Sequence, residues 1–171
     1  AVRALLTSGR ASRSGRLEAL ALGVLLLLGA VLFGRELSSP SAEFDEAVYL
    51  ASARALAEGA QLGGEVFSSQ PPLFFTFLEA AYAVADGNAV TIRIGMLVLT
   101  LAGGVAAWAL VRPMAGPVGG LIGAALFIMA PAVAERAAVV SADVPSVALG
   151  VGALAAAAAA GRRPVWGAAA G

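Results

Sequence analysis

Long uncharged stretches constrain this chain more than any other feature of its sequence. Four of them are long enough, or nearly long enough, to cross a lipid bilayer, at residues 19–34, 94–111, 113–134 and 144–161. A spanning helix needs about 20 mainly apolar residues. Only 13% of the 171 residues are charged, which is about half the share of an ordinary soluble domain. We therefore predict an all-α fold, a polytopic helical bundle that lies in a membrane.

We expect one transmembrane module over residues 1–171 with about four crossing helices, at residues 17–34, 88–111, 114–135 and 144–161. The first has a basic start and an apolar middle, which also fit a signal peptide. It has no clear small-residue cleavage site, which favours an uncleaved anchor. Residues 164–171 resemble the start of another span. Because the chain also begins with Ala, we expect it to be the N-terminal part of a longer protein.

The placement of arginines predicts the orientation of these helices. Short cytoplasmic loops carry an excess of basic residues, and the first span is preceded by Arg3, Arg10, Arg13 and Arg16. With an N-terminus in the cytoplasm and four crossings, Arg112 and the Arg162-Arg163 pair also fall inside. Asp45 and Asp143 then fall on the extracytoplasmic side. We predict an integral protein of the plasma membrane, within the cell envelope, whose active site faces outward.

Residue types absent from the chain exclude several kinds of chemistry. There is no cysteine and no histidine, so disulfides, thiol nucleophiles, zinc-thiolate sites and the commonest general base are excluded. Eleven basic residues balance eleven acidic ones, and no basic stripe indicates nucleic acid. Any reaction must therefore use carboxylates, arginine, hydroxyls or the backbone.

The first outer loop, residues 35–87, holds most of the polar side chains and is predicted to contain helices at 44–58 and 72–86. Asp45 and Glu46 stand in the first turn of the earlier helix, where the helix dipole favours negative charge. Taken alone, this pair also fits a simple helix cap. The later helix begins at a Pro-Pro pair, is too short to cross, and is expected to be buried against the spans. If it did cross, Arg112 would lie outside.

Two charges at the ends of spans are functional candidates by default, because charge inside a bilayer is costly. They are Arg93 and Asp143, which the four-span topology places on the same outer face as Asp45. Arg93 also fits a side chain that reaches lipid headgroups. Asp143, which precedes Val144-Pro145, also fits a helix start signal.

The order of these motifs resembles the N-terminal part of the GT-C fold glycosyltransferases over about residues 15–160. Within that superfamily the chain is most similar to the branch of the lipid A aminoarabinose transferases and protein O-mannosyltransferases. The motifs are Phe44-Asp45-Glu46 with Tyr49, Ala57-Glu58-Gly59, Gln70-Pro71-Pro72-Leu73, Val90-Thr91-Ile92-Arg93-Ile94-Gly95 and Asp143.

The resemblance implies an enzyme that moves a sugar from a polyprenyl-phosphate donor to an extracytoplasmic acceptor, which is a lipid, a glycan or a protein. It implies Asp45 as the catalytic carboxylate with Glu46 beside it, Arg93 near the carrier phosphate and Asp143 near the carrier. Tyr49 and Gln70 join the candidate substrate-binding residues, although Gln70 stands where the family often has a charged residue. No cofactor is certain. A divalent metal held by Asp45 and Glu46 is left open.

The chemistry suits this inventory of residues. A carboxylate in a water-poor site can deprotonate an acceptor hydroxyl, and an arginine fork suits a departing phosphate. Asp45, Arg93 and Asp143 are therefore expected around one outward-facing site. Two other functions stay open: a non-catalytic membrane subunit of the same fold, and a transporter segment. The transporter hypothesis requires ionisable residues in the middle of the spans, where they relay protons or ions.

Overall fold

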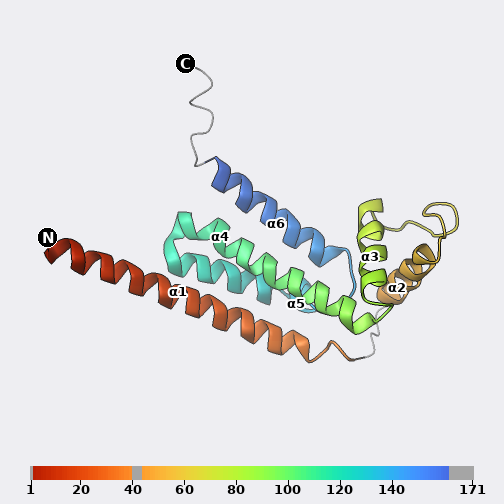
Figure 1. Ribbon diagram of the computed structural model, residues 1–171, viewed down its shortest axis with the longest axis horizontal. Helices are drawn as coiled ribbons and strands as arrows, with labels where there is room; N and C mark the ends of the chain where they lie inside the picture. The colour runs from red at the N-terminus through yellow and green to blue at the C-terminus, as the bar shows by residue number, and fades with distance from the viewer. Residues whose placement is uncertain (1, 40–43, 162–171) are drawn as a thin grey trace, which may run out of the picture.

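The computed structural model describes residues 2–39 and 44–161 (Figure 1). Residues 164–171, predicted to begin another span, lie outside the described residues. Within the described part the chain is helical, and its elements are α1 (Val2–Gly34), α2 (Phe44–Ala57), α3 (Pro72–Val84), α4 (Ala89–Met129), α5 (Pro131–Ala134) and α6 (Asp143–Ala160).

Three of the described helices are long and apolar enough to cross a bilayer: Arg13–Gly34 within α1, Ala89–Met129, and Asp143–Ala160. They lie together as a bundle, with α1 and α6 both packed on α4 (Figure 1). This confirms the predicted all-α membrane helical bundle. The helix α1 begins at Val2, well before the crossing predicted at 17–34.

The 41-residue α4 is a helical hairpin, because its backbone reverses at Gly116 with a φ of 72°. Only glycine adopts such a φ without steric cost, and Pro113 and Pro117 flank the reversal. The two arms pack antiparallel: a Cβ added at Gly104 would lie 2.7 Å from Ile128, and one added at Gly120 would lie 2.9 Å from Trp108. The crossings predicted at 88–111 and 114–135 overlap these arms, but the second arm ends at Met129, short of the predicted bound.

The helices α2 and α3 pack together as a small unit at one end of the bundle. Its core contains Tyr49, Ala53, Leu56, Phe75 and Leu78 and continues into α4 at Ile92 and Met96. At 13 residues, α3 spans only about 20 Å at 1.5 Å per residue, and it lies across the direction of the spans (Figure 1).

The expectation that α3 is largely buried against the spans is wrong. The helix α3 packs mainly against α2, and its residues Leu73 and Val84 are 80% and 89% exposed. The aromatic contacts of Tyr49 with Phe74 and Phe75 draw α3 to α2.

Candidate functional site

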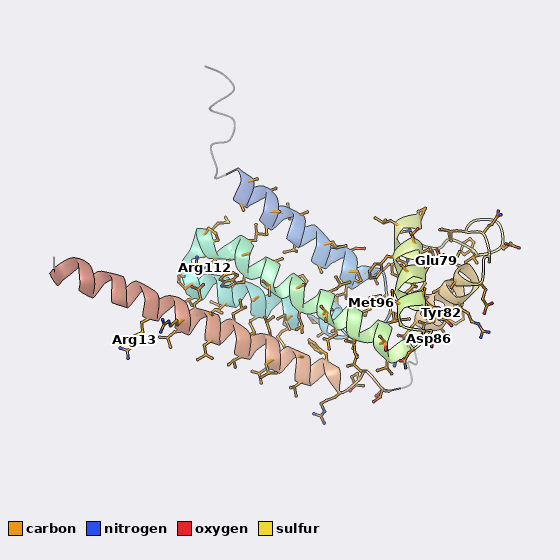
Figure 2. All side chains as sticks on the ribbon, viewed as in Figure 1. Arg13, Glu79, Tyr82, Asp86, Met96 and Arg112 are labelled. Atoms are coloured by element: carbon orange, nitrogen blue, oxygen red, sulfur yellow. The ribbon has the colours of Figure 1, made fainter. Side chains whose placement is uncertain are left out.

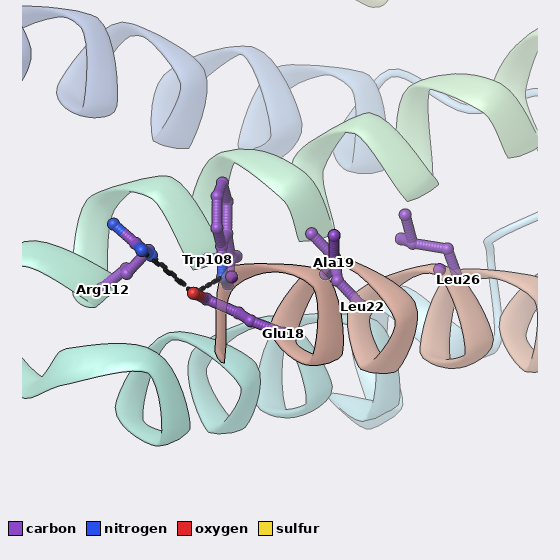
Figure 3. Close-up of a pocket in the computed structure, with 8 residues that line it drawn as sticks. Glu18, Ala19, Leu22, Leu26, Trp108 and Arg112 are labelled. Carbon is purple, nitrogen blue, oxygen red and sulfur yellow. Dashed lines mark hydrogen bonds and ion pairs between the residues drawn. The ribbon is translucent and has the colours of Figure 1, made fainter. Parts of the chain in front are cut away.

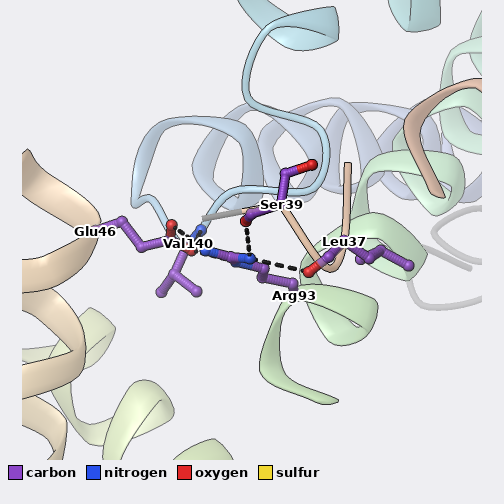
Figure 4. Close-up of polar contacts among 5 residues, drawn as sticks. All are labelled: Leu37, Ser39, Glu46, Arg93 and Val140. Carbon is purple, nitrogen blue, oxygen red and sulfur yellow. Dashed lines mark hydrogen bonds and ion pairs between the residues drawn. The ribbon is translucent and has the colours of Figure 1, made fainter. Parts of the chain in front are cut away.

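The predicted candidates Glu46 and Arg93 meet in a buried ion pair where α2 reaches the bundle (Figure 4). Arg93 donates from Nε to Oε1 of Glu46 at 2.9 Å and from Nη2 to Oε2 at 2.8 Å. Their side chains are 10% and 1% exposed. The two-pronged geometry matches a planar guanidinium to a carboxylate.

The same pair fastens two further segments of the chain. Nη1 of Arg93 donates to the backbone carbonyls of Leu37 and Ser39, at 2.9 and 2.7 Å. Oε1 of Glu46 accepts the backbone N–H of Val140 at 3.0 Å. We call this group of Leu37, Ser39, Glu46, Arg93 and Val140 the Glu46 joint. It connects the end of α1, α2, the start of α4 and the segment that precedes α6.

Asp45 stands beside the Glu46 joint, in the first turn of α2. Its side chain is exposed, and in the described part of the chain it has no hydrogen bond or ion pair to Arg93 or Asp143. Glu46 is fixed on one face of α2. The neighbouring Asp45 therefore lies on another face of the same helix turn, at a fixed position relative to the bundle. Its carboxylate is therefore left open to other groups.

Asp143 begins α6 and forms an ion pair with Arg136, whose Nη1 lies 2.8 Å from Oδ2. The interpretation of Asp143 as a helix cap is not what the structure shows, because α6 has no side-chain cap hydrogen bond. The pair is partly open, with side chains 33% (Arg136) and 64% (Asp143) exposed. It lies a few residues from Val140, so the Glu46 joint brings the segments of Asp45 and Asp143 to the same end of the bundle.

Tyr49 and Gln70, predicted to contact substrate, contact each other: Nε2 of Gln70 donates to the Tyr49 hydroxyl at 3.0 Å. Tyr49 is buried in the core of the α2–α3 unit. The bond ties the Pro-Pro turn to α2 in this structure.

The metal site considered at Asp45 and Glu46 does not fit the donors present. Both oxygens of Glu46 accept hydrogen bonds from the Arg93 cation. Among the described residues no group of three or more acidic side chains could hold a metal ion. Asp45 alone supplies too few ligands to hold a metal ion.

A second arginine-carboxylate pair, missed in the sequence, lies at the other end of the bundle (Figure 3). Glu18 on α1 accepts from Nε and Nη2 of Arg112 at 2.5 and 3.0 Å, and from the indole N–H of Trp108 at 3.0 Å. Arg112 also stacks on the Trp108 ring, 5.5 Å from its centroid. Glu18 stands within a span, and that alone is a signal that could have singled it out.

The fold and this site define a polytopic helical membrane protein with charged side chains gathered at its ends. Residues 69–171, more than half of the chain, match the family of dolichyl-phosphate-mannose-protein mannosyltransferases. The chain belongs to this family, whose members are glycosyltransferases of the GT-C type. The matched segment contains Gln70, Arg93 and Asp143 and begins after Glu46. No curated protein and no solved structure matches the chain.

Proposed function

We propose that this protein transfers a sugar from a polyprenyl-phosphate donor to an extracytoplasmic acceptor, at the end of the bundle that carries the Glu46 joint. The family membership supports the reaction class and the type of donor. The observation that carries the location is the bridge that Glu46 makes between Arg93 and Val140. It brings the segments of Asp45, Arg136 and Asp143 to one end of the spans.

Asp45 is the proposed general base. The acceptor hydroxyl gives its proton to the Asp45 carboxylate, and the acceptor oxygen bonds to the anomeric carbon of the sugar. The bond from that carbon to the phosphate oxygen breaks, and its electron pair leaves with the polyprenyl phosphate. The Asp45 carboxylate is exposed and is not bonded to Arg93 or Asp143, so an acceptor hydroxyl can reach it.

Arg136 is the arginine that we assign to the donor phosphate, with Asp143 orienting it. Arg93 was predicted to have this role from the resemblance. In this structure, however, four of its five N–H groups already donate to Glu46 and to two carbonyls. A phosphate at Arg93 would have to displace these contacts. Arg136 exposes a third of its side chain and can turn toward a phosphate, so Arg93 and Glu46 act as positioning residues.

The test is sugar transfer from a labelled polyprenyl-phosphate donor by the full-length protein reconstituted in vesicles. Asp45→Asn keeps the shape and removes the base, so turnover should fall about 100-fold or more. Asp86→Asn is the matched control, because Asp86 is another exposed carboxylate of the outer loop. Its φ of 50° is one that asparagine tolerates, so this variant should transfer at the parental rate.

Three results would overturn the proposal. Transfer by Asp45→Asn at the parental rate would return Asp45 to the role of a helix cap. Equal losses in both variants would show a general effect of charge in the loop. No transfer by the parent protein with any polyprenyl-phosphate sugar would favour the non-catalytic subunit.

A separate assay tests Arg136. Arg136→Gln should raise the KM for the lipid-linked donor more than it lowers kcat, because it weakens binding of the phosphate and leaves the base in place. The exposed Arg54 on α2, paired with Glu58, offers the control: Arg54→Gln should leave the KM for the donor unchanged. A KM unchanged in Arg136→Gln would remove Arg136 from the donor site.

A further inference from the structure

The Glu18 end of the bundle contains an open groove that the transfer reaction does not use. It has a volume of about 340 Å³ and lies between α1 and the first arm of α4 (Figure 3). One end of its wall is polar, with Glu18, Trp108 and Arg112, and the rest is apolar. The apolar part is formed by Ala19, Leu22, Gly23 and Leu26. A polar end joined to an apolar channel has the shape of a lipid headgroup followed by its acyl chain.

The charge at the polar end favours an anion. Glu18 is only 7% exposed and is already satisfied by three hydrogen bonds. The side chain of Arg112 is 44% exposed, and its Nη1 has no partner among the residues that the structure describes. The Glu18 carboxylate is therefore neutralised, and the exposed part of the Arg112 cation lines the groove.

We propose that this groove binds an anionic phospholipid of the bilayer, with its phosphate at Arg112 and one acyl chain along Leu22, Gly23 and Leu26. The guanidinium is held flat by Glu18 and by the Trp108 ring, so its outward N–H groups are preorganised for a phosphate oxygen. Arg112 lies one turn before the reversal at Gly116, which places it at the level of headgroups. A bound lipid would fill the space between α1 and α4 and fix their distance.

Fluorescence of Trp108 reports on the groove directly. The chain has two tryptophans, so Trp166→Phe leaves Trp108 as the only one. This protein is reconstituted in phosphatidylcholine vesicles that contain acyl-brominated phosphatidylglycerol or acyl-brominated phosphatidylcholine as a quencher. One arginine near a membrane surface contributes enough attraction for about fivefold tighter binding. Brominated phosphatidylglycerol should therefore quench Trp108 at about one fifth of the mole fraction that brominated phosphatidylcholine needs.

Three variants distinguish a lipid-binding site from an ion pair that only holds α1 to α4. Arg112→Gln should abolish the preference for phosphatidylglycerol, whereas Glu18→Gln should increase it, because the competing carboxylate is gone. Gly23→Leu should weaken quenching by both lipids, because the new side chain fills the groove. A Cβ at Gly23 meets no atom within 4 Å, and the same is true of Gly150 on α6, so Gly150→Leu is the matched control.

Equal quenching by the two lipids in the parent protein would overturn the proposal. So would a preference that stays the same in Arg112→Gln and Glu18→Gln, or quenching by both lipids that is unchanged in Gly23→Leu. Shielding of Trp108 from both lipids that grows with protein concentration would show that a second copy of the chain covers the groove instead.

Discussion

Each end of the bundle holds an arginine-carboxylate pair, and the paired residues are 47 and 94 residues apart in sequence. The two pairs differ in what surrounds them. At the Glu46 joint the side chains of Arg93 and Glu46 are 10% and 1% exposed, and the backbone of three other residues closes around them. At the Glu18 end the corresponding figures for Arg112 and Glu18 are 44% and 6%, and a groove lies alongside. Arg112 and the outer-loop residue Asp86 mark the two ends in Figure 2.

One kind of contact therefore serves two purposes. A closed pair fixes its neighbours, because breaking it leaves a buried charge without a partner. A half-open pair still holds α1 to α4 but offers part of its cation to another molecule. Another pair, Arg54 on α2 with Glu58 one turn later, is 67% and 65% exposed. Its hydrogen bond to Glu58 raises the pKa of Arg54, but an exposed pair of this kind contributes little to stability.

The largest expected effect on stability comes from breaking the closed pair. Glu46→Ala should lower the free energy of unfolding by about 3 to 5 kcal/mol, because Arg93 is left buried and unpaired. Chemical denaturation in detergent micelles measures this change. The double variant Glu46→Leu with Arg93→Met should recover much of the loss, since a well-packed apolar pair can replace a buried ion pair. A double variant no more stable than Glu46→Ala would contradict this account.

A smaller loss of stability is expected inside the α4 hairpin, where its two arms pack against each other and against α6. A Cβ at Gly103 would lie 2.5 Å from Phe127 and 2.9 Å from the Cβ of Ala148. Gly103→Ala should therefore cost about 1 to 3 kcal/mol by overpacking. Gly150→Ala, in open space, should cost nothing, and both are measured by the same denaturation. Equal stability of the two variants would mean that the arms are not packed as described.

A still smaller loss is expected at the half-open pair, and it should depend on salt. Glu18→Gln removes the charge but keeps an acceptor for Trp108, so the melting temperature should fall less than in Glu46→Gln. Raising the salt concentration should reduce the contribution of Glu18 more than that of Glu46, since exposed pairs are screened more strongly. Melting curves at low and high salt measure both. A larger fall in Glu18→Gln would reverse the comparison of the two ends.

The smallest effect is expected at the exposed pair on α2. Arg54→Gln should leave the melting temperature within experimental error, because the Arg54 and Glu58 side chains are held in one geometry largely in water. A clear loss of stability would show that exposure is a poor guide to the importance of charge pairs in this protein.

The sequence could predict the elements that depend on local pattern. Apolar length indicates the spans, and the Pro-Pro pair marks where α3 begins. Contacts between distant segments could not be read in the same way. Nothing near Arg93 shows that its carboxylate is Glu46, 47 residues away, or that Val140 completes the joint.

Two functional candidates were missed for specific reasons. Glu18 was hidden in the run of apolar residues at the first span, although a carboxylate there is itself unusual. Arg136 follows Glu135 after a span and resembles an ordinary loop charge; only the pairing with Asp143 gives it a role. The predictions of Asp45 as a base and of an extracytoplasmic site stay predictions.

Cysteine labelling tests whether the Glu46 joint and the groove lie on opposite sides of the membrane. The chain has no cysteine of its own, so each substitution gives a single label. Ala47→Cys, next to Asp45, and Ala115→Cys, next to the hairpin reversal, are both exposed positions. A membrane-impermeant maleimide added to intact cells should label position 47, and should label position 115 only after the cells are opened. Labelling of both positions from the outside would contradict the account.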